Sequence, residues 1–361
     1  MARQAVQFRA ARKRPQAAQF RAARKQLLRR SRGFVTMTLV ALSTFGAASA
    51  VQAAPAPAPA YVISTENVND RQANVLVFSP SMNKPVPIQI IRAADRSKAR
   101  PTLYLLNGAD GGEGTATWDK QSDAVSFFKD KNVNVVTPMG GRNSYYTDWE
   151  RDDAVLGRNK WQTFLNQELP PVIEKVLGAN GSRSIAAISM TGTSVLNLAI
   201  AKPGFWKSVA SYSGCAGTSD PVGQQYVKLV VETWGGAQSV ENMWGPLNGP
   251  GWRANDPVVN ADKLRGTPIY ISGGSGIPSA PNDTPANPRI TDGRANLPSQ
   301  IVLGSAIEAA VHNCNVSLVN RLNDLHIPNT FHDRPVGTHS WGYWQDDLHS
   351  SWPFLAQTLG V

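Results

Sequence analysis

One segment, residues 183–193 with the sequence RSIAAISMTGT, constrains the fold of this chain most strongly. Its short apolar run leads directly into Ser189, and small residues and a helical pattern follow. A serine on a tight turn between a strand and a helix projects its hydroxyl from the end of a sheet, at the N-terminus of the helix. The pattern therefore predicts either a nucleophilic serine on such a turn or a structural serine that begins a helix.

The residues around Ser189 depart from the usual G-x-S-x-G pattern, in which small flanking residues let the turn pass close to neighbouring backbone. Ala187 and Thr191 occupy the flanking positions, and Gly192 follows one place later. Alanine is a mild departure, whereas threonine is a larger one. The local pattern alone leaves both interpretations of Ser189 open.

Short runs rich in valine and isoleucine alternate with helical patterns through the rest of the chain. The predicted strands are 73–78, 86–91, 102–106, 133–137, 184–188, 208–213 and 268–272. The predicted helices are 122–129, 160–176, 193–202, 221–232, 299–325 and 341–358. This alternation predicts an α/β fold with a mostly parallel sheet, in which the first two strands form an antiparallel hairpin at the edge. We expect 234–260, rich in Gly, Trp and Pro, to be a long loop or short helices that cover a site.

The N-terminal 53 residues hold 11 of the 36 lysines and arginines and no acid, so the remaining 308 residues carry 25 bases against 26 acids. The positive charge therefore belongs to this segment, and nucleic acid is not an expected partner of the folded body. A basic start, an apolar run at 34–50 and small residues at 51–53 predict a secretory signal peptide over 1–53. A membrane anchor and a basic nucleic-acid-binding arm are the alternatives.

The alternating proline and alanine of APAPAPA follows the apolar run and is typical of an extended spacer. We expect a Pro/Ala-rich linker over 54–66 and one folded domain over 67–361. Removal of the signal peptide leaves a mature form with no integral membrane span.

A nucleophilic serine needs a base and an acid. Of the five histidines, His339 lies in the sequence GTHSW just before the last predicted helix. Hydrolases of the α/β class carry their histidine at this place, after the serine and the acid in the chain. His332 is a further candidate, and His312, His326 and His349 are expected to be surface or packing residues.

The acid should lie between Ser189 and His339. Glu308 stands in the apolar context AIEAA, where an unpaired carboxylate would be costly to bury. Asp283 and Asp292, in a polar loop rich in Pro and Gly, are the alternatives, and the simpler interpretation of both is a solvated loop acid.

A glycine-rich loop, NGADGGEG at 107–114, follows the predicted strand at 102–106. It lacks both G-x-x-x-x-G-K-[ST] and G-x-G-x-x-G, so nucleotide binding is not expected. In a hydrolase, such a loop supplies one backbone N–H to the oxyanion hole, and the residue after the serine, here Met190, supplies the other. No His, Cys and Asp cluster has metal-ligand spacing, and we expect neither a metal nor a cofactor.

Several longer motifs occur in a fixed order along the body. They are LLNG (105–108), PMGGRNSYYTDW (138–149), FLNQELPPVI (164–173), AISMTG (187–192), SYSG (211–214), NMWGP (242–246) and GTHSWGYW (337–344). Together they resemble the secreted mycolyltransferases of mycolic-acid bacteria, the antigen 85 complex and its corynebacterial relatives, in the α/β-hydrolase superfamily.

The resemblance implies an α/β-hydrolase fold with a mostly parallel central sheet flanked by helices and no large separate lid domain. It implies Ser189 as nucleophile, Glu308 as acid and His339 as base, with the N–H groups of Met190 and Ala109 as oxyanion donors. The implied reaction moves a mycoloyl group from a trehalose glycolipid to the serine and then to a sugar hydroxyl of the cell envelope, outside the membrane.

The loop after the first parallel strand departs from the family. Antigen 85 proteins typically carry L-D-G-L-R, in which the Asp and the Arg help to bind trehalose, and this chain has Asn107 and Asp110 at those places. The departure leaves open a different acceptor, a shorter acyl chain or plain hydrolysis. Trp118 and Trp341 are the aromatic candidates for substrate contacts, although large aromatic residues more often fill a core.

The two cysteines, Cys215 and Cys314, follow the SYSG motif and Glu308 respectively. An exported protein meets an oxidising compartment, and two cysteines permit one bridge. The strand end and the acid-bearing helix are expected to meet near the site, so we predict a disulfide. The functional hypotheses are a secreted acyltransferase, a secreted serine carboxylesterase and a non-catalytic envelope binding protein.

Overall fold

The computed structural model describes residues 58–289 and 296–361. The predicted signal peptide over 1–53 lies outside these residues. The folded part begins earlier than expected, because Tyr61–Asn67 forms strand β1 and pairs with the next strand. The linker predicted over 54–66 is therefore too long at its C-terminal end. Its last residues gave no strand signal because β1 is an edge strand with mostly exposed side chains.

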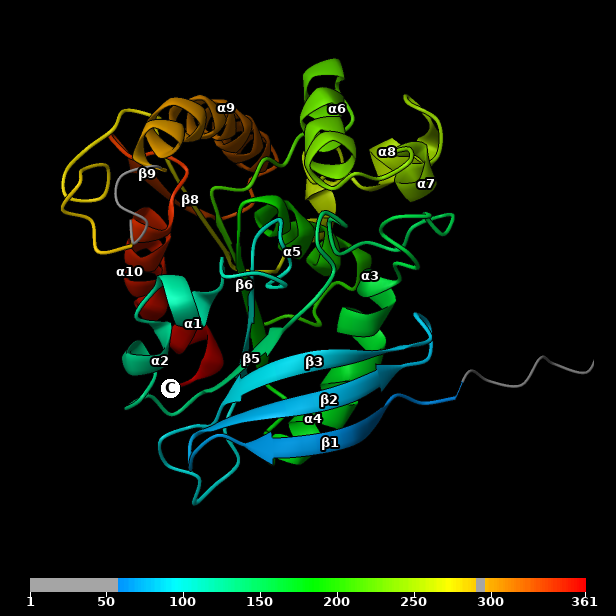
Figure 1. The fold of residues 1–361 in the computed structure, drawn as a ribbon, viewed down its shortest axis with the longest axis vertical. Helices are drawn as coiled ribbons and strands as arrows, with labels where there is room; N and C mark the ends of the chain where they lie inside the picture. Colours follow the sequence, from blue (N-terminus) through cyan, green and yellow to red (C-terminus); the bar gives the residue numbers. More distant parts are fainter. Residues whose placement is uncertain (1–57, 290–295) are drawn as a thin grey trace, which may run out of the picture. The chain divides into compact units, whose positions relative to one another are not determined.

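Within the described residues, nine strands form one sheet in the order β1-β2-β3-β5-β4-β6-β7-β8-β9 (Figure 1). Their bounds after β1 are β2 Gln72–Ser79, β3 Lys84–Ile91, β4 Thr102–Leu106, β5 Asn134–Pro138, β6 Arg183–Ile188, β7 Val209–Tyr212, β8 Ile269–Gly274 and β9 Thr330–Arg334. Neighbours from β5 to β9 pair in parallel, as predicted. The β2–β3 hairpin is antiparallel, as predicted, but lies one strand inside the edge because β1 covers it.

The helices agree with the predicted pattern, with short additions. They are α1 Trp118–Gln121, α2 Ala124–Phe127, α3 Trp161–Thr163, α4 Leu169–Leu177, α5 Met190–Ala201, α6 Pro221–Lys228, α7 Glu241–Trp244, α8 Pro250–Ala254, α9 Leu297–Asp324 and α10 Trp341–Leu359. A π-helical turn, η1 Phe164–Glu168, joins α3 to α4, η2 Leu229–Trp234 continues α6, and the 3-10 turn η3 is Ala261–Leu264. None of the helices in 58–289 and 296–361 is both long and apolar enough to cross a bilayer.

The parallel strands β4 to β8 are buried on both faces, which gives two apolar layers. Along β4, Tyr104 and Leu106 point to one layer, while Leu103 and Leu105 point to the other. Residues of α4, α5 and α9 fill the first layer, and residues of α1, α2 and α10 fill the second, on opposite sides of the sheet in Figure 1. A parallel sheet covered on both faces explains why its strands read as continuous apolar runs.

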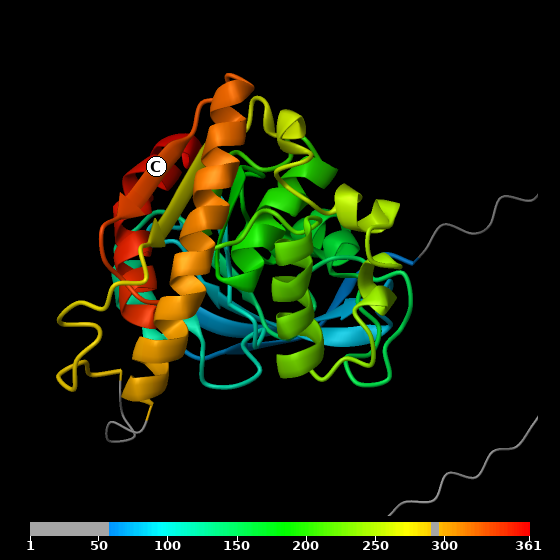
Figure 2. The same ribbon diagram turned by 90° about the horizontal axis from the view of Figure 1, so that it is seen from above.

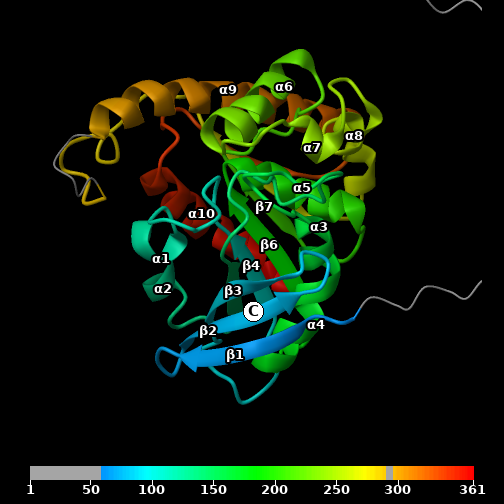
Figure 3. The same cartoon turned by 45° about the vertical axis from the view of Figure 1, so that its right-hand side comes forward.

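A third apolar cluster lies beyond the sheet ends and contains Met190, the residue after Ser189. The segment 234–260, predicted to be a loop or short helices, contributes α7 and α8 to this cluster. Figure 3 shows α6, α7 and α8 lying together past the ends of β6 and β7, with α9 beside α6. In Figure 2, the long helix α9 (orange) runs alongside α10 (red). These elements surround the edge of the sheet at which Ser189 lies.

Candidate active site

Ser189 occupies the turn between β6 and α5, as the local pattern predicts. Its φ of 56° and ψ of −131° belong to a region that side-chain-bearing residues rarely adopt. The turn is held by the Ser189 N–H, which donates to the Tyr212 carbonyl of β7 at 2.8 Å. A strained serine between a strand and the first turn of a helix is the geometry of a nucleophile elbow.

The structure explains why Thr191 is tolerated in this turn. The position that passes close to neighbouring backbone is Gly192, where an added Cβ would lie 2.9 Å from the Gly214 Cα and 2.9 Å from the Ser211 Oγ. Thr191 instead donates its hydroxyl to the carbonyl of Asn107 at 2.6 Å. The apparent departure from the pattern therefore ties the serine turn to the loop after β4.

The three residues predicted as nucleophile, base and acid form one hydrogen-bonded chain. The Oγ of Ser189 lies 2.8 Å from Nε2 of His339, and Nδ1 of His339 lies 2.7 Å from Oε2 of Glu308. Glu308 is fully buried in α9, and His339 lies in the loop that precedes α10. The spacing allows His339 to accept the Ser189 proton while Glu308 orients the ring.

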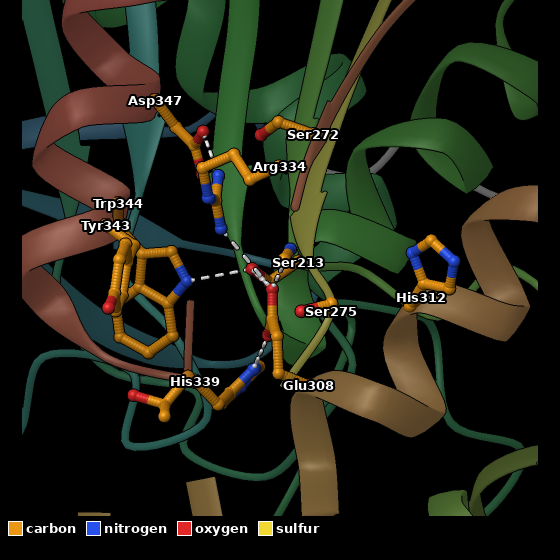
Figure 4. A network of polar contacts seen from close by, with 12 residues as sticks. Ser213, Ser272, Ser275, Glu308, His312, Arg334, His339, Tyr343, Trp344 and Asp347 are labelled. Atoms are coloured by element: carbon orange, nitrogen blue, oxygen red, sulfur yellow. Dashed lines mark hydrogen bonds and ion pairs between the residues drawn. The ribbon is translucent and has the colours of Figure 1, made fainter. Parts of the chain in front are cut away.

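The second oxygen of Glu308 is also enclosed by donors, as Figure 4 shows. Oε1 accepts from the Ser213 hydroxyl at 2.7 Å and from the Gly274 N–H at 2.7 Å, and Nη2 of Arg334 lies 3.4 Å away. The indole N–H of Trp344 donates to Ser213 at 3.1 Å, so the network continues to α10. These contacts offset the cost of burying the carboxylate.

The alternative acid Asp283 has a different task. It does not contact His339 but accepts hydrogen bonds from the hydroxyls of Thr338 and Tyr343, both at 2.6 Å. Asp283 is therefore not a solvated loop acid: it is buried and anchors the residue beside His339. Burial, and next the hydrogen bond to Asp283, raise the pKa of Tyr343, so its hydroxyl remains a donor. The other alternative, Asp292, lies outside the described residues.

The remaining histidine candidates lie elsewhere. His332 faces Asp347, with Nδ1 3.8 Å from the carboxylate oxygen. His312 and His349 lie 3.1 Å from Asp333 and 2.9 Å from Asp123 respectively. His332 therefore takes no part in the chain that begins at Ser189.

The loop after β4 lies beside the nucleophile, as the predicted oxyanion hole requires. An added Cβ on Gly108 would lie 3.7 Å from the Cβ of Ser189. The Ala109 carbonyl accepts from the Asn143 N–H at 2.7 Å, which fixes the peptide that follows it. Met190 is the first residue of α5, and the N–H groups of a first helical turn have no acceptor within the helix. Gly108 and Met190 therefore lie beside Ser189, and the oxyanion role of the Met190 and Ala109 N–H groups stays a prediction.

Two residues predicted to contact the substrate, Asn107 and Trp118, have buried side chains. Asn107 is fully buried, and its amide oxygen accepts from the Trp118 N–H at 3.1 Å. Trp118 is also buried and donates its indole N–H to the Leu106 carbonyl at 2.9 Å. Asp110 is half-buried and accepts from the Gly112 N–H at 2.9 Å. Asn107, Trp118 and Asp110 thus shape the loop after β4.

Two cavities meet at His339. An apolar cavity of about 240 Å³ reaches Ser189, with lining that includes Tyr145, Met190, Leu229, Leu303 and Ile307. A more polar cavity of about 370 Å³ lies next to it, with lining that includes Gln121, Arg289, Gln300 and the predicted contact Trp341. The reacting groups therefore lie between an apolar space and a polar one.

The predicted disulfide between Cys215 and Cys314 is confirmed. It connects the segment just after β7 to α9, six residues beyond Glu308. Cys215 also lines the apolar cavity. The bridge thus holds the helix of the acid against the strand ends near Ser189.

The sequence pattern did not predict four contributors to the site, Ser213, Gly274, Arg334 and Asp347. Ser213, Gly274 and Arg334 donate to Glu308 from strand ends that only the folded sheet brings together. A signal did exist for Asp347, because helical spacing places it on the same face of α10 as the buried Trp344, Leu348 and Ser351. An acid on an apolar helix face is evidence of a buried partner.

The comparisons with known proteins agree with this geometry. A family model described as "Putative esterase" matches residues 79–355. The diacylglycerol acyltransferase/mycolyltransferase Ag85A of Mycobacterium leprae (strain TN) is 32% identical over 293 residues, which cover 79% of this chain and 82% of that protein. Ag85B of the same strain, with the same description, is 31% identical over 294 residues, 78% and 83% of the two chains. The chain belongs to the antigen 85 family of mycolyltransferases.

Solved structures show the same fold at lower identity. The crystal structure of Mycobacterium tuberculosis MPT51 (FbpC1) matches with a TM-score of 0.66 and 23% identity, over 81% of this chain and 100% of that chain. A ferulic acid esterase matches with a TM-score of 0.55 and 18% identity, over 83% and 98% of the two chains. The predicted α/β-hydrolase fold of the antigen 85 family is thus confirmed, without a separate large lid domain in the described part of the chain.

Proposed function

We propose that this antigen 85 family member is an exported acyltransferase that carries a mycoloyl group on Ser189 and passes it to a sugar hydroxyl. The observation that supports this most is the continuous chain from Ser189 through His339 to the buried Glu308, with distances of 2.8 and 2.7 Å. A serine, a histidine and a carboxylate in this order activate the serine for attack on an ester.

In the first half-reaction, Ser189 Oγ attacks the ester carbonyl of a trehalose glycolipid, and His339 Nε2 takes the serine proton. The N–H groups of Met190 and Ala109 receive the developing oxyanion. The trehalose oxygen then leaves with the proton from His339, and an ester on Ser189 remains. Glu308 stabilises the imidazolium that exists between these two proton transfers.

In the second half-reaction, a hydroxyl of the acceptor sugar gives its proton to His339 and attacks the ester on Ser189. Collapse of the tetrahedral intermediate returns the proton to Ser189 and releases the new glycolipid. Water in place of the sugar would give free acid, so exclusion of water decides between transfer and hydrolysis.

The two cavities beside His339 support this assignment of substrate parts. The apolar cavity at Ser189 suits the part of an acyl chain next to the ester. The polar cavity presents an indole, a guanidinium and amide groups, which suit a sugar because its rings stack on aromatic faces and its hydroxyls take hydrogen bonds. Trp341 and Arg289 are the proposed acceptor contacts.

Trehalose monomycolate tests the proposal directly. Purified protein is incubated with it, and the lipids are separated. Trehalose dimycolate is the expected product, and free mycolate alone would instead indicate an esterase. Ser189→Ala is the matched control and should abolish both products. Absence of turnover by the folded wild-type protein would contradict the proposed function and favour a binding protein.

We also assign the protein to the cell envelope outside the membrane, because its N-terminal 53 residues have the pattern of a secretory signal. The substrates of this reaction are envelope glycolipids and sugars. N-terminal sequencing of the protein recovered from culture medium and envelope tests this assignment, and a cytoplasmic protein that retains residues 1–53 would contradict it.

A further inference from the structure

Behind the proposed triad, one buried guanidinium contacts two buried carboxylates. Arg334, the last residue of β9, lies with Nη2 3.4 Å from Oε1 of Glu308, and its Nη1 donates to Oδ1 of Asp347 in α10. Both acids are fully buried, and 9% of Arg334 is exposed. Figure 4 shows the line that runs from His339 through Glu308 and Arg334 to Asp347. Three charges therefore interact strongly in a region of low dielectric constant.

The charges of Arg334 and Asp347 affect each other's pKa values. Burial alone would lower the pKa of Arg334, but Asp347 and Glu308 raise it above its usual value, so Arg334 stays a cation. Burial raises the pKa of Asp347 to about 6, although Arg334 acts to lower it. Above about pH 6, two carboxylates thus share one positive charge.

The surroundings of Asp347 contain few other charges. His332 of β9 lies 3.8 Å from its Oδ1, and the phenols of Tyr212 and Tyr270 approach from β7 and β8. Asp346 acts on Arg334 from the same helix, and the Tyr343 ring lies 5.5 Å from the guanidinium carbon. Around His339, Glu308 is the adjacent charge and Trp344 packs edge-on at 4.9 Å.

The contacts of Arg334 and Asp347 are incomplete for a purely structural ion pair. Within the described residues, Nε of Arg334 has no hydrogen-bond partner, and Asp347 has one further partner besides Arg334, the Ser272 hydroxyl. A buried pair of charges is weak support for stability unless its geometry satisfies both groups. Arg334 contacts Glu308, and Glu308 in turn contacts the His339 ring. This connection indicates that the pair acts on the reacting residues.

We propose that Arg334 and Asp347 are positioning residues of the triad: Arg334 orients Glu308 and places a positive charge beside it, and Asp347 determines how much of the Arg334 charge acts on His339. This inference rests on the proposed function, because it takes Ser189, His339 and Glu308 as the reacting set. It extends the three-residue chain by two residues on separate elements, β9 and α10.

The two positions have opposite electrostatic effects on His339. In Arg334→Met the cation nearest to Glu308 is lost, and Asp347, left unpaired in the interior, takes up a proton. The histidine then holds its proton to higher pH. In Asp347→Asn the Arg334 charge is no longer balanced, and the histidine releases its proton at lower pH. A shift of about 0.5 pH unit or more is expected in each direction.

Two measurements test whether the His339 titration shifts in opposite directions in the two variants. One is the midpoint of the acid limb of kcat/KM for hydrolysis of a 4-nitrophenyl ester, and the other is the midpoint of the His339 ring titration by NMR, assigned by its loss in His339→Gln. Arg183→Met and Glu174→Gln are the matched controls, because they break a buried arginine–glutamate pair of α4 and β6. The controls should lower stability without moving either midpoint.

The expected result is a rise of both midpoints in Arg334→Met and a fall in Asp347→Asn. In the double variant the midpoint should match that of Arg334→Met, because Asp347 is already neutral there. Shifts of the same sign, or no shift in folded variants, would overturn the inference. If Arg334→Met does not fold, Asp347→Asn, which preserves shape, decides by the sign of its shift.

The NMR titration separates failure of this inference from failure of the proposed function. It reports the coupling to His339 even when no acyl group is transferred. Opposite NMR shifts in a protein that forms no trehalose dimycolate would support the positioning role and contradict only the acyl transfer. Normal transfer with unmoved midpoints would contradict only the positioning role.

Discussion

Two arginines in this protein pair with glutamates, the half-buried Arg183 on the central strand β6 and the buried Arg334 on the edge strand β9. The two sites differ in how completely the charges are satisfied. Arg183 begins β6 and binds Glu174 through two hydrogen bonds, of 2.7 and 2.8 Å. Arg334 ends β9 and divides its donors between Glu308 and Asp347. The Arg183–Glu174 pair contacts none of the reacting residues, whereas Arg334 is connected to His339 through Glu308.

The comparison shows that burial of an ion pair does not by itself reveal its task. The Glu174 pair has a further donor in the Tyr104 hydroxyl at 3.1 Å and contacts none of the reacting groups. The Glu308 group has unequal contacts and, within the described residues, an Arg334 Nε without a hydrogen-bond partner, yet it orients the proposed base. We therefore expect the first site to affect mainly stability and the second mainly catalysis.

The largest expected difference is in activity. Glu308→Gln should lower kcat/KM by about 10³-fold or more, because the amide cannot stabilise the imidazolium or hold the correct tautomer of His339. Glu174→Gln, the same chemical change in the Arg183 pair, should leave kcat/KM within about twofold. Ester hydrolysis at about pH 8 by the two folded variants measures this, and similar losses in both would remove the distinction.

The loss of stability should be larger in Glu174→Gln than in Glu308→Gln, the reverse of the order expected for activity. Glu174→Gln leaves the Arg183 guanidinium without its anion and should cost about 2–3 kcal/mol of unfolding free energy, less than a fully buried pair because Arg183 is partly exposed. Glu308→Gln leaves Arg334 balanced by Asp347 and should cost about 1 kcal/mol or less. Urea unfolding at neutral pH compares them; a greater loss in Glu308→Gln would refute the expected order.

The pH dependence of stability should differ between the wild type and Asp347→Asn. The pKa of Asp347 is raised to about 6 in the folded state, so the group binds its proton more tightly there than in the unfolded chain. Its contribution to stability is greatest below about pH 4 and is lost as the pH rises through 6. Relative to Asp347→Asn, the wild type should lose about 2 kcal/mol between pH 4 and pH 7. Parallel stability curves would show that Asp347 does not titrate in this range.

The smallest expected effects come from two hydroxyl donors. Ser213→Ala removes one of the donors to Glu308 and should lower kcat about tenfold, because the Gly274 N–H and Arg334 remain. Tyr104→Phe removes the donor to Glu174 and should cost about 1 kcal/mol of stability with unchanged kcat. Steady-state kinetics and urea unfolding of both variants measure this, and a loss of activity in Tyr104→Phe would go against the comparison.

The extent to which the fold was predictable depends on burial. The strands β4 to β8 are continuous apolar runs because the sheet buries both of their faces. Burial alternates along β2 and β3, and their buried residues were still apolar enough to predict a hairpin. The strands β1 and β9 lie at the sheet edges, and their exposed and polar side chains left no pattern. The pairing of edge strands depends on backbone hydrogen bonds, which the sequence does not display.

The site was predictable where a residue's type and motif imply its chemistry. Ser189 and His339 stand in specific motifs, and the apolar context of Glu308 implied a buried partner. The direction of a side chain was not predictable in the same way, so Asn107 and Trp118 were assigned to the substrate although both side chains are buried. Arg334 was missed because its partners come from α9 and α10, and only the tertiary fold brings them together.

The central claim, that Ser189 carries the acyl group before a sugar takes it, is tested most directly by peptide mass spectrometry of the acid-quenched enzyme. The protein is mixed with a short-chain trehalose ester, quenched in acid and digested. The account predicts one acyl adduct, on the peptide that contains Ser189, which free trehalose discharges with formation of new ester and which is absent in Ser189→Ala. Turnover without any adduct on Ser189, or an adduct that persists in Ser189→Ala, would contradict the account.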